Sequence, residues 1–395
     1  MVGCACQKGR KSMQIHTVRE GESVFHIARQ YDTSALTIIA NNALIYPDRL
    51  VVGEQLVILR PTRTHTVRGT ETLSEIAKRY EIRQSELVRN NPTLLCNPTV
   101  HPGQLIALRY APPKGGMSAG LGYVREGTTV DALSCALPYL SYFVLDACRI
   151  REGAEIEWKR PTHLGRIIKE RKTPLLRIEA VGSAPTADTV ERIAERAIGE
   201  GYYGIVLGDG CLAQEERHER DAYLLSVRRR MLGCGLILFV EGDLDSDFGD
   251  YADGNILLPG AMWKAGERMG ARFDRMAERY ECAKTFLGLP CACEDAGSAI
   301  SYQEMREIAY KYKAVIREEA DGEGALSYRR YQNGRGEDRT IRIPSPEYLT
   351  RLIGYLGEYG MMGAAVEIDT VPTFLWMLLH TLLGEVDYAL SRLTC

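Results

Sequence analysis

Acidic residues stand at the ends of several short apolar runs in the C-terminal part of this 395-residue chain. They are Asp146, Glu179, Asp209, Glu241, Asp243, Glu367 and Asp369. Two carboxyl groups, one protonated and one ionised, can perform general acid–base chemistry when their separation suits the reaction. Carboxylates at such places also cap loops or form a solvated rim. We therefore treat these residues as candidates for catalysis, with loop capping as the alternative.

The apolar runs that precede these carboxylates alternate with helical patterns. Runs at 120–124, 141–146, 173–181, 202–210, 236–243 and 361–369, together with GNILLPG and AKTFLGLP, predict the strands of a sheet. Amphipathic segments such as TADTVERIAERAIGEG lie between them. About 275 residues are available, the usual size of an eight-stranded barrel. The pattern predicts an α/β fold, a (β/α)8 TIM-type barrel with a small insertion between strands 7 and 8.

The N-terminal region contains one pattern twice. Residues 16–42, HTVREGESVFHIARQYDTSALTIIANN, match residues 65–91, HTVRGTETLSEIAKRYEIRQSELVRNN, at an offset of 49. Each copy has a His-Thr-Val run, a polar turn, a hydroxyl residue suited to an N-cap, and apolar residues at helical spacing. A second helix is expected to end at an Asn-Asn pair, which tolerates left-handed backbone. A turn and a strand follow, VVGEQLVIL or HPGQLIAL, so each copy predicts a βααβ module.

Both copies resemble the LysM module, over residues 15–59 and 64–108, in the H-T-V start, the Asn-Asn pair and the G-x-x-L or G-x-L ending. The resemblance implies binding of the N-acetylglucosamine backbone of peptidoglycan or chitin in a groove between the first turn and the turn before the last strand. The candidate glycan-binding residues are Gly21, Glu22, Ser23, Val24, Tyr46, Pro47, Thr70, Glu71, Thr72, Leu73, Asn97 and Val100. Thr70 stands where the first copy has Gly21, which would restrict backbone approach in the second groove. The alternative is a pair of modules that serve only as spacers.

The segment from Ser301 to Gly363 combines a helix, a charged hairpin, a strand and a last barrel helix. This order resembles the end of the glycoside hydrolase family 18 barrel, in the branch of spore-cortex-lytic N-acetylglucosaminidases. Members of that branch also carry paired LysM modules ahead of the barrel. The resemblance implies substrate-assisted hydrolysis, in which the sugar acetamide attacks the anomeric carbon.

The family motif on the fourth strand is D-G-x-x-x-D-x-E, in which the Glu is the general acid and the second Asp steadies the acetamide. Laid on residues 203–210, its first Asp falls on Tyr203 and its Gly on Gly204. Gly208 takes the place of the assisting Asp, and Gly210 takes the place of the acid. Asp209 is expected to point to the opposite side of the strand.

Two further positions depart from the family. Leu258-Pro259-Gly260 stands where a Tyr-Asp pair ends the sixth strand, and Glu367 stands where a Trp floors the sugar subsite. We therefore predict a glycan-binding protein whose barrel has lost its acid, with a spore-associated structural or accessory role. The alternative is an active N-acetylglucosaminidase on cortex peptidoglycan that uses relocated carboxylates, the candidates being Asp146, Glu179, Asp209, Glu241 and Glu367. A sugar-phosphate enzyme would need a glycine-rich phosphate loop and leaves the repeats unexplained.

The net charge and the apolar runs of the chain argue against nucleic acid and membranes as partners. A formal net charge of -3 gives no field that would favour nucleic acid, and no apolar run reaches the roughly 18 residues of a membrane helix. The basic N-terminus lacks a following apolar stretch, which predicts no signal peptide and synthesis in the cytoplasm. Together with the wall-binding modules, the resemblance to spore proteins implies assembly at the spore surface. The expected partners are peptidoglycan or chitin-type glycan, together with spore coat or cortex proteins suggested by the resemblance.

We expect no cofactor and no metal. The eleven cysteines are odd in number and scattered, which predicts reduced thiols. The pairs Cys4/Cys6 and Cys291/Cys293 could jointly supply four thiolates to zinc, but they lie far apart and no His reinforces them. Residues 109–118, with Pro, Gly and Ser, are predicted to link the second module to a barrel domain spanning 119–395.

Overall fold

The computed structural model describes residues 13–96, 98–111, 119–151, 155–180, 185–212, 217–243, 251–258, 268–319, 324–332 and 335–383. Its contacts divide the chain into two compact units. One contains residues 1–112, 292–349 and 372–381, and the other contains residues 113–291, 350–371 and 382–395. The predicted boundaries at 15–59, 64–108, 109–118 and 119–395 follow sequence patterns rather than contacts, and they remain a prediction.

Each N-terminal repeat folds as predicted into a βααβ module. The first consists of β1 (Met13–Thr17), α1 (Val24–Gln30), α2 (Ala35–Asn42) and β2 (Gln55–Leu59), with β1 antiparallel to β2. The second consists of β3 (Arg63–Thr66), α3 (Leu73–Tyr80), α4 (Gln84–Asn90), a short α5 (Thr93–Cys96) and β4 (Leu105–Arg109). Separate small cores form inside the two modules, centred on Ile27 and Ile76.

The hydroxyl residues predicted as N-caps occupy those positions. Ser23 accepts a hydrogen bond from the backbone N–H of His26 at the start of α1. Thr72 and Glu75 form a reciprocal capping box at the start of α3. These caps satisfy backbone donors at the helix starts, which helps such short helices to form.

The Asn pairs act through their side chains rather than through left-handed backbone, so the predicted reason for them was wrong. Asn42 donates from its side-chain nitrogen to the carbonyls of Ile38 and Val57, and its side-chain oxygen accepts from the Val57 N–H at 2.7 Å. Asn91 repeats this pattern with Leu87 and Ala107. The left-handed residue after α2 is Ala43 instead. Each of these two asparagines therefore ties the second helix of its module to the last strand.

Eight parallel strands among the described residues close into the predicted barrel. They are β5 (Ala119–Val124), β6 (Tyr142–Ile150), β8 (Thr173–Ala180), β9 (Gly204–Leu207), β10 (Ile237–Gly242), β11 (Gly254–Leu257), β12 (Thr285–Gly288) and β18 (Gly363–Glu367). They pair in chain order, and β18 pairs with β5 to close the ring. A short additional strand, β7 (Ile156–Trp158), pairs antiparallel with the end of β6.

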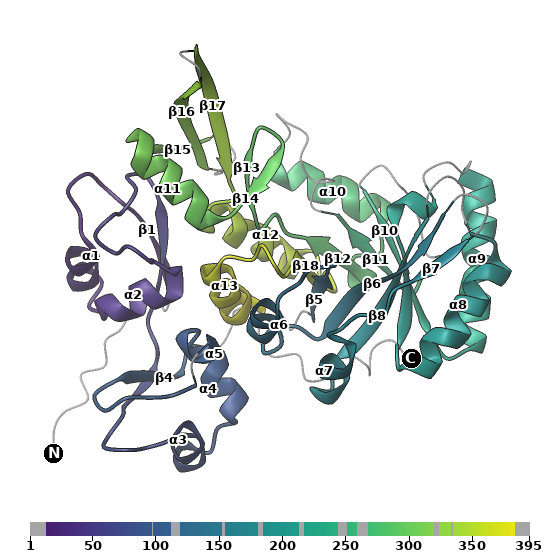
Figure 1. Ribbon diagram of the computed structural model, residues 1–395, viewed down its shortest axis with the longest axis horizontal. Helices are drawn as coiled ribbons and strands as arrows, with labels where there is room; N and C mark the ends of the chain where they lie inside the picture. Colours follow the sequence, from purple (N-terminus) through teal and green to yellow (C-terminus); the bar gives the residue numbers. More distant parts are fainter. Residues whose placement is uncertain are drawn as a thin grey trace. The chain divides into compact units, whose positions relative to one another are not determined.

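Helices follow the strands as a barrel requires (Figure 1). They are α6 (Val130–Ala136), α7 (Leu164–Lys169), α8 (Ala187–Glu200), α9 (Arg217–Gly233), α10 (Met269–Arg279), α12 (Pro346–Glu358) and α13 (Thr373–Leu383). Helix α8 begins at the Thr186 cap and ends at Gly201, whose φ of 91° needs a glycine. Within the described residues, the helices are too short or too polar to span a bilayer.

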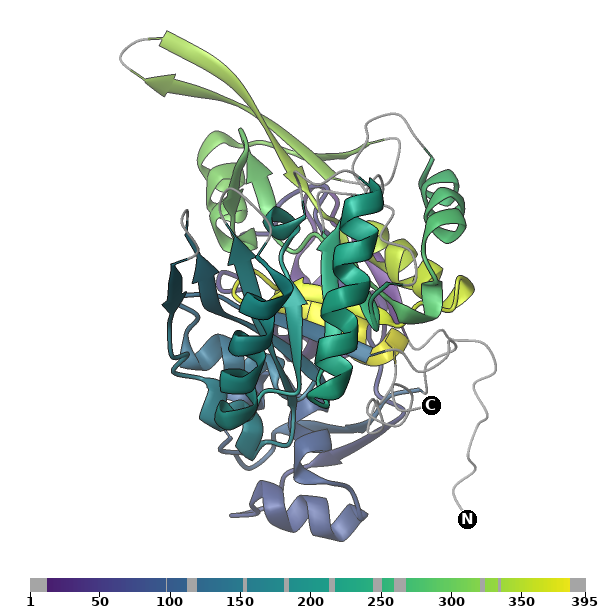
Figure 2. The ribbon, with the colours of Figure 1, turned by 90° about the vertical axis from the view of Figure 1, so that its right-hand side faces the viewer.

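The insertion before the last strand forms an antiparallel sheet with one helix. Its elements are β13 (Cys293–Asp295), β14 (Ser298–Ile300), α11 (Tyr302–Tyr312), β15 (Ile316–Glu318), β16 (Gly324–Gln332) and β17 (Arg335–Ile343). The strand order is β14-β13-β17-β16-β15. Strands β16 and β17 extend beyond the rest of this sheet as a long ribbon (Figure 1; Figure 2).

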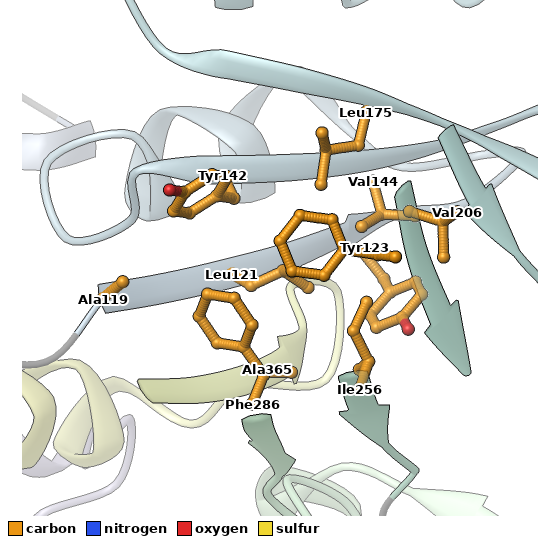
Figure 3. Close-up of a cluster of buried hydrophobic side chains, with 11 residues drawn as sticks. Ala119, Leu121, Tyr123, Tyr142, Val144, Leu175, Val206, Ile256, Phe286 and Ala365 are labelled. Carbon is orange, nitrogen blue, oxygen red and sulfur yellow. The ribbon is translucent and has the colours of Figure 1, made fainter. Parts of the chain in front are cut away.

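The barrel interior is filled by side chains from alternate positions of the strands (Figure 3). Tyr142, Phe239 and Phe286 contact one another edge to face or tilted, with ring centroids 5.6 to 6.2 Å apart. Leu175, Val206 and other small or branched residues complete this layer. Because side chains alternate between the two faces of a strand, the next inward position on each strand lies two residues further on. Those positions form the candidate site.

Candidate functional site

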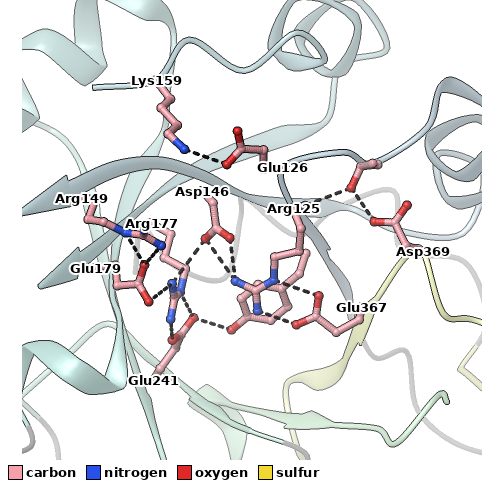
Figure 4. Close-up of polar contacts among 12 residues, drawn as sticks. Arg125, Glu126, Asp146, Arg149, Lys159, Arg177, Glu179, Glu241, Glu367 and Asp369 are labelled. Carbon is pink, nitrogen blue, oxygen red and sulfur yellow. Dashed lines mark hydrogen bonds and ion pairs between the residues drawn. The ribbon is translucent and has the colours of Figure 1, made fainter. Parts of the chain in front are cut away.

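Charged residues take over from the apolar core at the carboxyl ends of the strands. Two residues beyond inward-facing core positions stand Arg125, Asp146, Arg177, Gly208, Glu241 and Glu367. Apart from Gly208, they are linked by hydrogen bonds and ion pairs (Figure 4). This network lies where a barrel enzyme has its active site.

The most buried part of the network joins β8 to β10. Arg177 donates to both oxygens of Glu241 at 2.8 Å, and the Glu241 side chain is 0% exposed. The Tyr123 hydroxyl also donates to Glu241, at 2.8 Å. Burial alone would lower the pKa of Arg177, but its bonds to Glu241 raise that pKa above the ordinary value. Burial and then the charge of Glu241 raise the pKa of Tyr123, so both groups keep their protons.

Arg125 holds the other carboxylates. Its guanidinium donates to Asp146 at 2.9 Å and to both oxygens of Glu367, the first of them at 3.0 Å. It also lies over the Tyr123 ring, 4.5 Å from the centroid. Bonds to Glu367 and Asp146 raise the pKa of Arg125, although burial opposes this. Arg177 also approaches Asp146, at 3.4 Å, so the two arginines share this carboxylate.

The Arg177 side chain lies against Gly208, the position predicted for the assisting Asp. A Cβ on Gly208 would lie 3.0 Å from Arg177 Nη2 and 3.0 Å from the Ile178 carbonyl oxygen. Gly210 lies in a 3-10 turn over Asp209–Cys211, where a Cβ would lie 2.9 Å from the Ala180 oxygen. The two glycines thus leave room for a guanidinium and for neighbouring backbone.

Asp209 does not follow the strand alternation expected of it. Strand β9 ends at Leu207, and the chain turns at Asp209, so the period-two rule no longer applies there. The Asp209 carboxylate lies 3.8 Å from Arg177 Nη2 and is 62% exposed. The Asp209 side chain is therefore more open to solvent than those of Asp146, Glu179, Glu241 and Glu367.

The carboxylates of Glu179 and Asp369 also accept hydrogen bonds, whereas at Asp243 the printed contact is made by the backbone carbonyl. Arg149 donates to Glu179 at 2.7 Å, and the Thr128 hydroxyl donates to Asp369. The Asp243 backbone carbonyl accepts from the Tyr280 hydroxyl at 2.7 Å. A general acid must present a proton to the leaving group, whereas a carboxylate in a guanidinium pair serves as an acceptor. Asp146, Glu179, Glu241 and Glu367 are all used in the second way.

One small cavity lies beside the network among the described residues. A cavity lined by Tyr123, Ile256, Gly288 and Glu367 has a volume of about 10 Å³, enough for one water molecule but not for a sugar ring. Glu367, at the predicted place of the subsite Trp, is held by Arg125. Leu258 also lines this cavity. Pro259 and Gly260 lie outside the described residues.

A second candidate site lies at the first turn of each module. In the first module, His16 bridges the Tyr31 hydroxyl at 3.1 Å and Glu22 at 2.8 Å. In the second module, His65 bridges Tyr80 at 3.0 Å and Glu71 at 2.8 Å. An ionised carboxylate only accepts, so the Nε2 atom of each histidine carries the hydrogen.

Each of these glutamates also closes its turn by accepting from a backbone N–H. The donors are Arg19 for Glu22 and Arg68 for Glu71, both at 2.8 Å. The bond from Arg68, followed by that from His65, lowers the pKa of Glu71 from 4.5 to about 2. Burial alone would raise the pKa of Glu22, but the bonds from Arg19 and His16 lower it. The two glutamates therefore hold the candidate glycan turns in shape.

The remaining candidates of the turns differ in accessibility. Val24 and Leu73 are buried in the module cores, so at these positions the backbone is what a ligand can reach. Gly21 and Thr70 are exposed, and Tyr46 is 48% exposed. Pro47 and Val100 are partly exposed, and Asn97 lies outside the described residues. The left-handed residue of the second turn is Gly69 (φ 54°), one position before Thr70, so this turn has kept a glycine.

The cysteines whose side chains the structure describes are free thiols, namely Cys135, Cys148, Cys211, Cys234, Cys282, Cys291 and Cys293. Burial raises the pKa values of Cys291 and Cys293, which disfavours the thiolate that zinc needs. Cys4 and Cys6 lie outside the described residues. In the described part of the chain, no group of three or more His, Cys, Asp or Glu side chains is placed to hold a metal ion.

Comparisons with known proteins agree with this architecture. The LysM domain model matches residues 16–59 and 65–109, so the chain carries two LysM domains. The spore cortex-lytic enzyme SleL of Bacillus megaterium is similar in structure, with a TM-score of 0.70 and 18% identity over 96% of this chain and 100% of that chain. SleL of Bacillus cereus gives a TM-score of 0.67 at 18% identity, over 95% of this chain and 99% of that chain.

A chitinase from Chromobacterium violaceum matches with a TM-score of 0.56 and 16% identity, over 68% of this chain and 100% of that chain. A search of curated protein sequences found no significant match. At these identities the likeness establishes the fold. The chain thus combines two LysM domains with a glycoside hydrolase family 18-like barrel, which confirms the resemblance seen in its sequence.

Sequence reasoning named the carboxylates but missed the arginines that hold them. Arg177 interrupts the apolar run TPLLRIEAV two residues after the inward-facing Leu175. A charged residue at an inward position of a barrel strand needs a buried partner, and this signal was available. The partner, Glu241, could not be identified from sequence because it lies on a different strand. The sequence likewise shows that His16 and His65 occupy equivalent positions of the two repeats, but not that each bridges a Tyr and a Glu.

We predict that Arg177→Met destabilises the barrel by about 3–5 kcal/mol, because Glu241 would remain buried without its guanidinium. The double variant Arg177→Met/Glu241→Leu should recover much of this loss, since no buried charge is left unpaired. Urea unfolding followed by circular dichroism measures both variants against the wild type. A single variant as stable as the wild type would show that the pair is not a constraint on the fold.

We also predict an acid-sensitive second module. Since the pKa of Glu71 is lowered from 4.5 to about 2 in the folded state, its ionised form stabilises the module at and above pH 5, and this contribution is lost as the pH falls towards 2. Hydrogen exchange of peptides from residues 65–109, corrected for intrinsic rates, should show weaker protection across that range. Glu71→Gln should flatten this dependence, while Glu22→Gln should affect only the first module. An unchanged profile in Glu71→Gln would contradict the assignment.

Proposed function

We propose that this protein binds N-acetylglucosamine-containing glycan of peptidoglycan through its LysM domains, and that its barrel does not hydrolyse that glycan. The observation that carries the second part is the Arg177 side chain in the space facing Gly208. The first part is supported by the two LysM matches and by turns built alike in both modules.

Glycan binding would use the first turn and the turn before the last strand of each module. Backbone groups and short polar side chains suit this task, because neutral sugars are held by hydrogen bonds rather than by charge. In the first module we propose Gly21, Glu22, Ser23, Val24, Tyr46 and Pro47. In the second we propose Thr70, Glu71, Thr72, Leu73, Asn97 and Val100. Glu22 and Glu71 would act by positioning their turns, since both carboxylates accept from histidine and backbone.

Hydrolysis with assistance from the substrate acetamide requires an acid beside the leaving group and a group that steadies the acetamide. The family positions for these two groups are Gly210 and Gly208, neither of which has an ionisable side chain. Arg177 and Arg125 instead present positive charge, already paired with Glu241, Asp146 and Glu367. These features support a barrel that serves as a scaffold.

A spore-associated structural or accessory role follows as part of the proposal. The structurally similar proteins of Bacillus megaterium and Bacillus cereus are named spore cortex-lytic enzymes. A relative that binds the same glycan without cleaving it would act in the cortex or at its boundary with the coat. Spore coat or cortex proteins would then be neighbouring partners.

One observation favours the alternative of an active glycosidase. Asp209 is 62% exposed at the mouth of the barrel, and its nearest charged partner in the described structure, Arg177, is 3.8 Å away. An exposed carboxylate beside a fixed network could in principle serve as a relocated acid. The same assay of hydrolysis tests both proposals.

Purified protein should release no product from chitin oligomers or cortex muropeptides above background. Loss of a general acid typically costs on the order of 10²–10⁴ in rate, and the assisting Asp is missing as well. Gly208→Asp/Gly210→Glu should restore a trace at most, because Arg177 would pair with the new Asp and Glu367 still occupies the subsite position. Product analysis by chromatography measures this.

Asp209→Asn and Glu367→Gln complete the assay. Cleavage by the wild type that either substitution abolishes, in a protein whose circular dichroism is unchanged, would replace the scaffold proposal with the relocated-acid alternative. Cleavage that both substitutions leave intact would also reject an inactive barrel and would point to an acid elsewhere.

Glycan binding should be measurable by titration calorimetry of the full chain with chitin oligomers and muropeptides. Since the proposed contacts are neutral hydrogen bonds, the affinity should change little between low and moderate salt. Absence of heat at millimolar ligand, or binding abolished by moderate salt, would reject LysM-mediated recognition of this kind.

A further inference from the structure

The first LysM module is packed against helix α11 of the insertion, and both belong to the same compact unit. Arg306 of α11 donates to Glu54 at 2.8 Å, and Glu54 is only 4% exposed. The same guanidinium donates to the carbonyls of Ala43 and Asn42, both at 3.0 Å, at the end of α2. One arginine thus fixes α11 to both sides of the turn before the last strand of the first module, since Asn42 and Ala43 precede this turn and Glu54 follows it.

Strand β15 also holds the segment that follows this turn, at Val52 and Gly53. The Ile316 N–H donates to the Val52 carbonyl at 2.9 Å. Gly53 has a φ of 85°, and a Cβ there would overlap the Ile316 carbonyl oxygen. The equivalent glycine of the second module, Gly103, has nearly the same φ of 82°, but no described atom lies within 4 Å of its Cβ position. The close approach of the insertion is therefore a property of the first module.

This packing brings an aromatic side chain of α11 beside the proposed glycan turn. Tyr310 follows Arg306 by four residues, so both lie on the same face of the helix. The Arg49 guanidinium lies over the Tyr310 ring, 4.7 Å from its centroid, and over the Tyr46 ring, 4.8 Å from its centroid. The Arg49 backbone N–H also donates to the Tyr46 carbonyl at 2.9 Å. This bond closes the turn that carries the side chains of Tyr46 and Arg49.

The two rings remain accessible. Tyr46 is 48% exposed and Tyr310 is 58% exposed, although aromatic side chains of this size usually bury most of their area. A pyranose ring has an apolar face of C–H groups that packs on an aromatic ring, and hydroxyl groups that remain hydrated. Two exposed rings joined by a guanidinium suit a chain of such sugars better than a single sugar.

We infer that Tyr310 extends the glycan-binding groove of the first LysM module, so that a longer N-acetylated glycan contacts both the module and the insertion. This inference rests on the proposed function, because it assumes that the groove beside Tyr46 binds glycan. It adds that the first module prefers longer oligomers than the second, and that the insertion belongs to the binding surface.

The test uses the full chain with chitotriose and chitohexaose. Hydrogen exchange of peptides from residues 43–54 reports the first module, peptides from residues 98–104 report the second, and peptides from residues 302–312 report α11. Chitohexaose should protect 43–54 and 302–312 together, whereas chitotriose should protect 43–54 alone. Titrations followed at 43–54 give the affinity of the first module separately.

Tyr310→Ala should weaken chitohexaose binding at the first module about tenfold, the size expected for loss of one aromatic contact, and should leave chitotriose binding and the second module unchanged. Tyr310→Phe keeps the ring and should bind within about twofold of the wild type. Ile198→Ala removes a similarly exposed apolar side chain from α8 and serves as the control.

The possible outcomes distinguish a failure of the role of Tyr310 from a failure of glycan binding by the LysM domains. Normal chitohexaose binding by Tyr310→Ala, or protection of 43–54 without 302–312, would overturn the role of Tyr310 and leave glycan binding intact. No protection of either module by either oligomer in the wild type would overturn glycan binding and this inference together.

Discussion

The buried ion pair between Arg177 and Glu241 is the constraint on which the barrel mouth depends. Two charges removed from water cost much free energy unless each is matched in geometry and in hydrogen bonds. Here both oxygens of Glu241 accept from Arg177, and Tyr123 donates a further bond. Gly208 belongs to the same arrangement, because a side chain there would compete with the guanidinium for space. The lack of a side chain at Gly208 and the position of the Arg177 guanidinium are thus two aspects of one packed layer.

The charged layer at the barrel mouth bears on the proposal that the barrel does not hydrolyse glycan. An open family 18 site would need room for a sugar and a proton to donate. The described mouth instead contains two arginines and their carboxylates, with a cavity of about 10 Å³ beside Glu367. These charge pairs join strands β5, β6, β8, β10 and β18 at their carboxyl ends. In barrel enzymes this end carries the catalytic residues, which are often held in strained or less stable arrangements. This network is the basis of the proposal that the barrel does not hydrolyse glycan.

The LysM modules show the opposite tendency, since their polar interactions shape the surface that would meet a ligand. His16 with Glu22, and His65 with Glu71, hold the first turn from within. The two modules then diverge in their surroundings. Arg306 and Ile316 pack against the first, whereas Gly103 of the second has open space around it. Two modules with the same fold and the same sequence pattern can therefore have different surroundings.

The sequence by itself determined the local features. Periodicity and caps predicted the βααβ repeats, and the alternation of strands and helices predicted the barrel. The assignment of Gly208 and Gly210 to the positions of the family's Asp and Glu came from one motif and stays a prediction. These features depend on residues close together along the chain. Tertiary structure alone decided which partners the charges have. Arg177 finds Glu241 across 64 residues and Arg125 finds Glu367 across 242, because barrel closure brings distant strands together. The turn at Asp209, the clamps made by Asn42 and Asn91, and the place of Tyr310 beside Tyr46 arise in the same way, since each depends on contacts that no local pattern encodes.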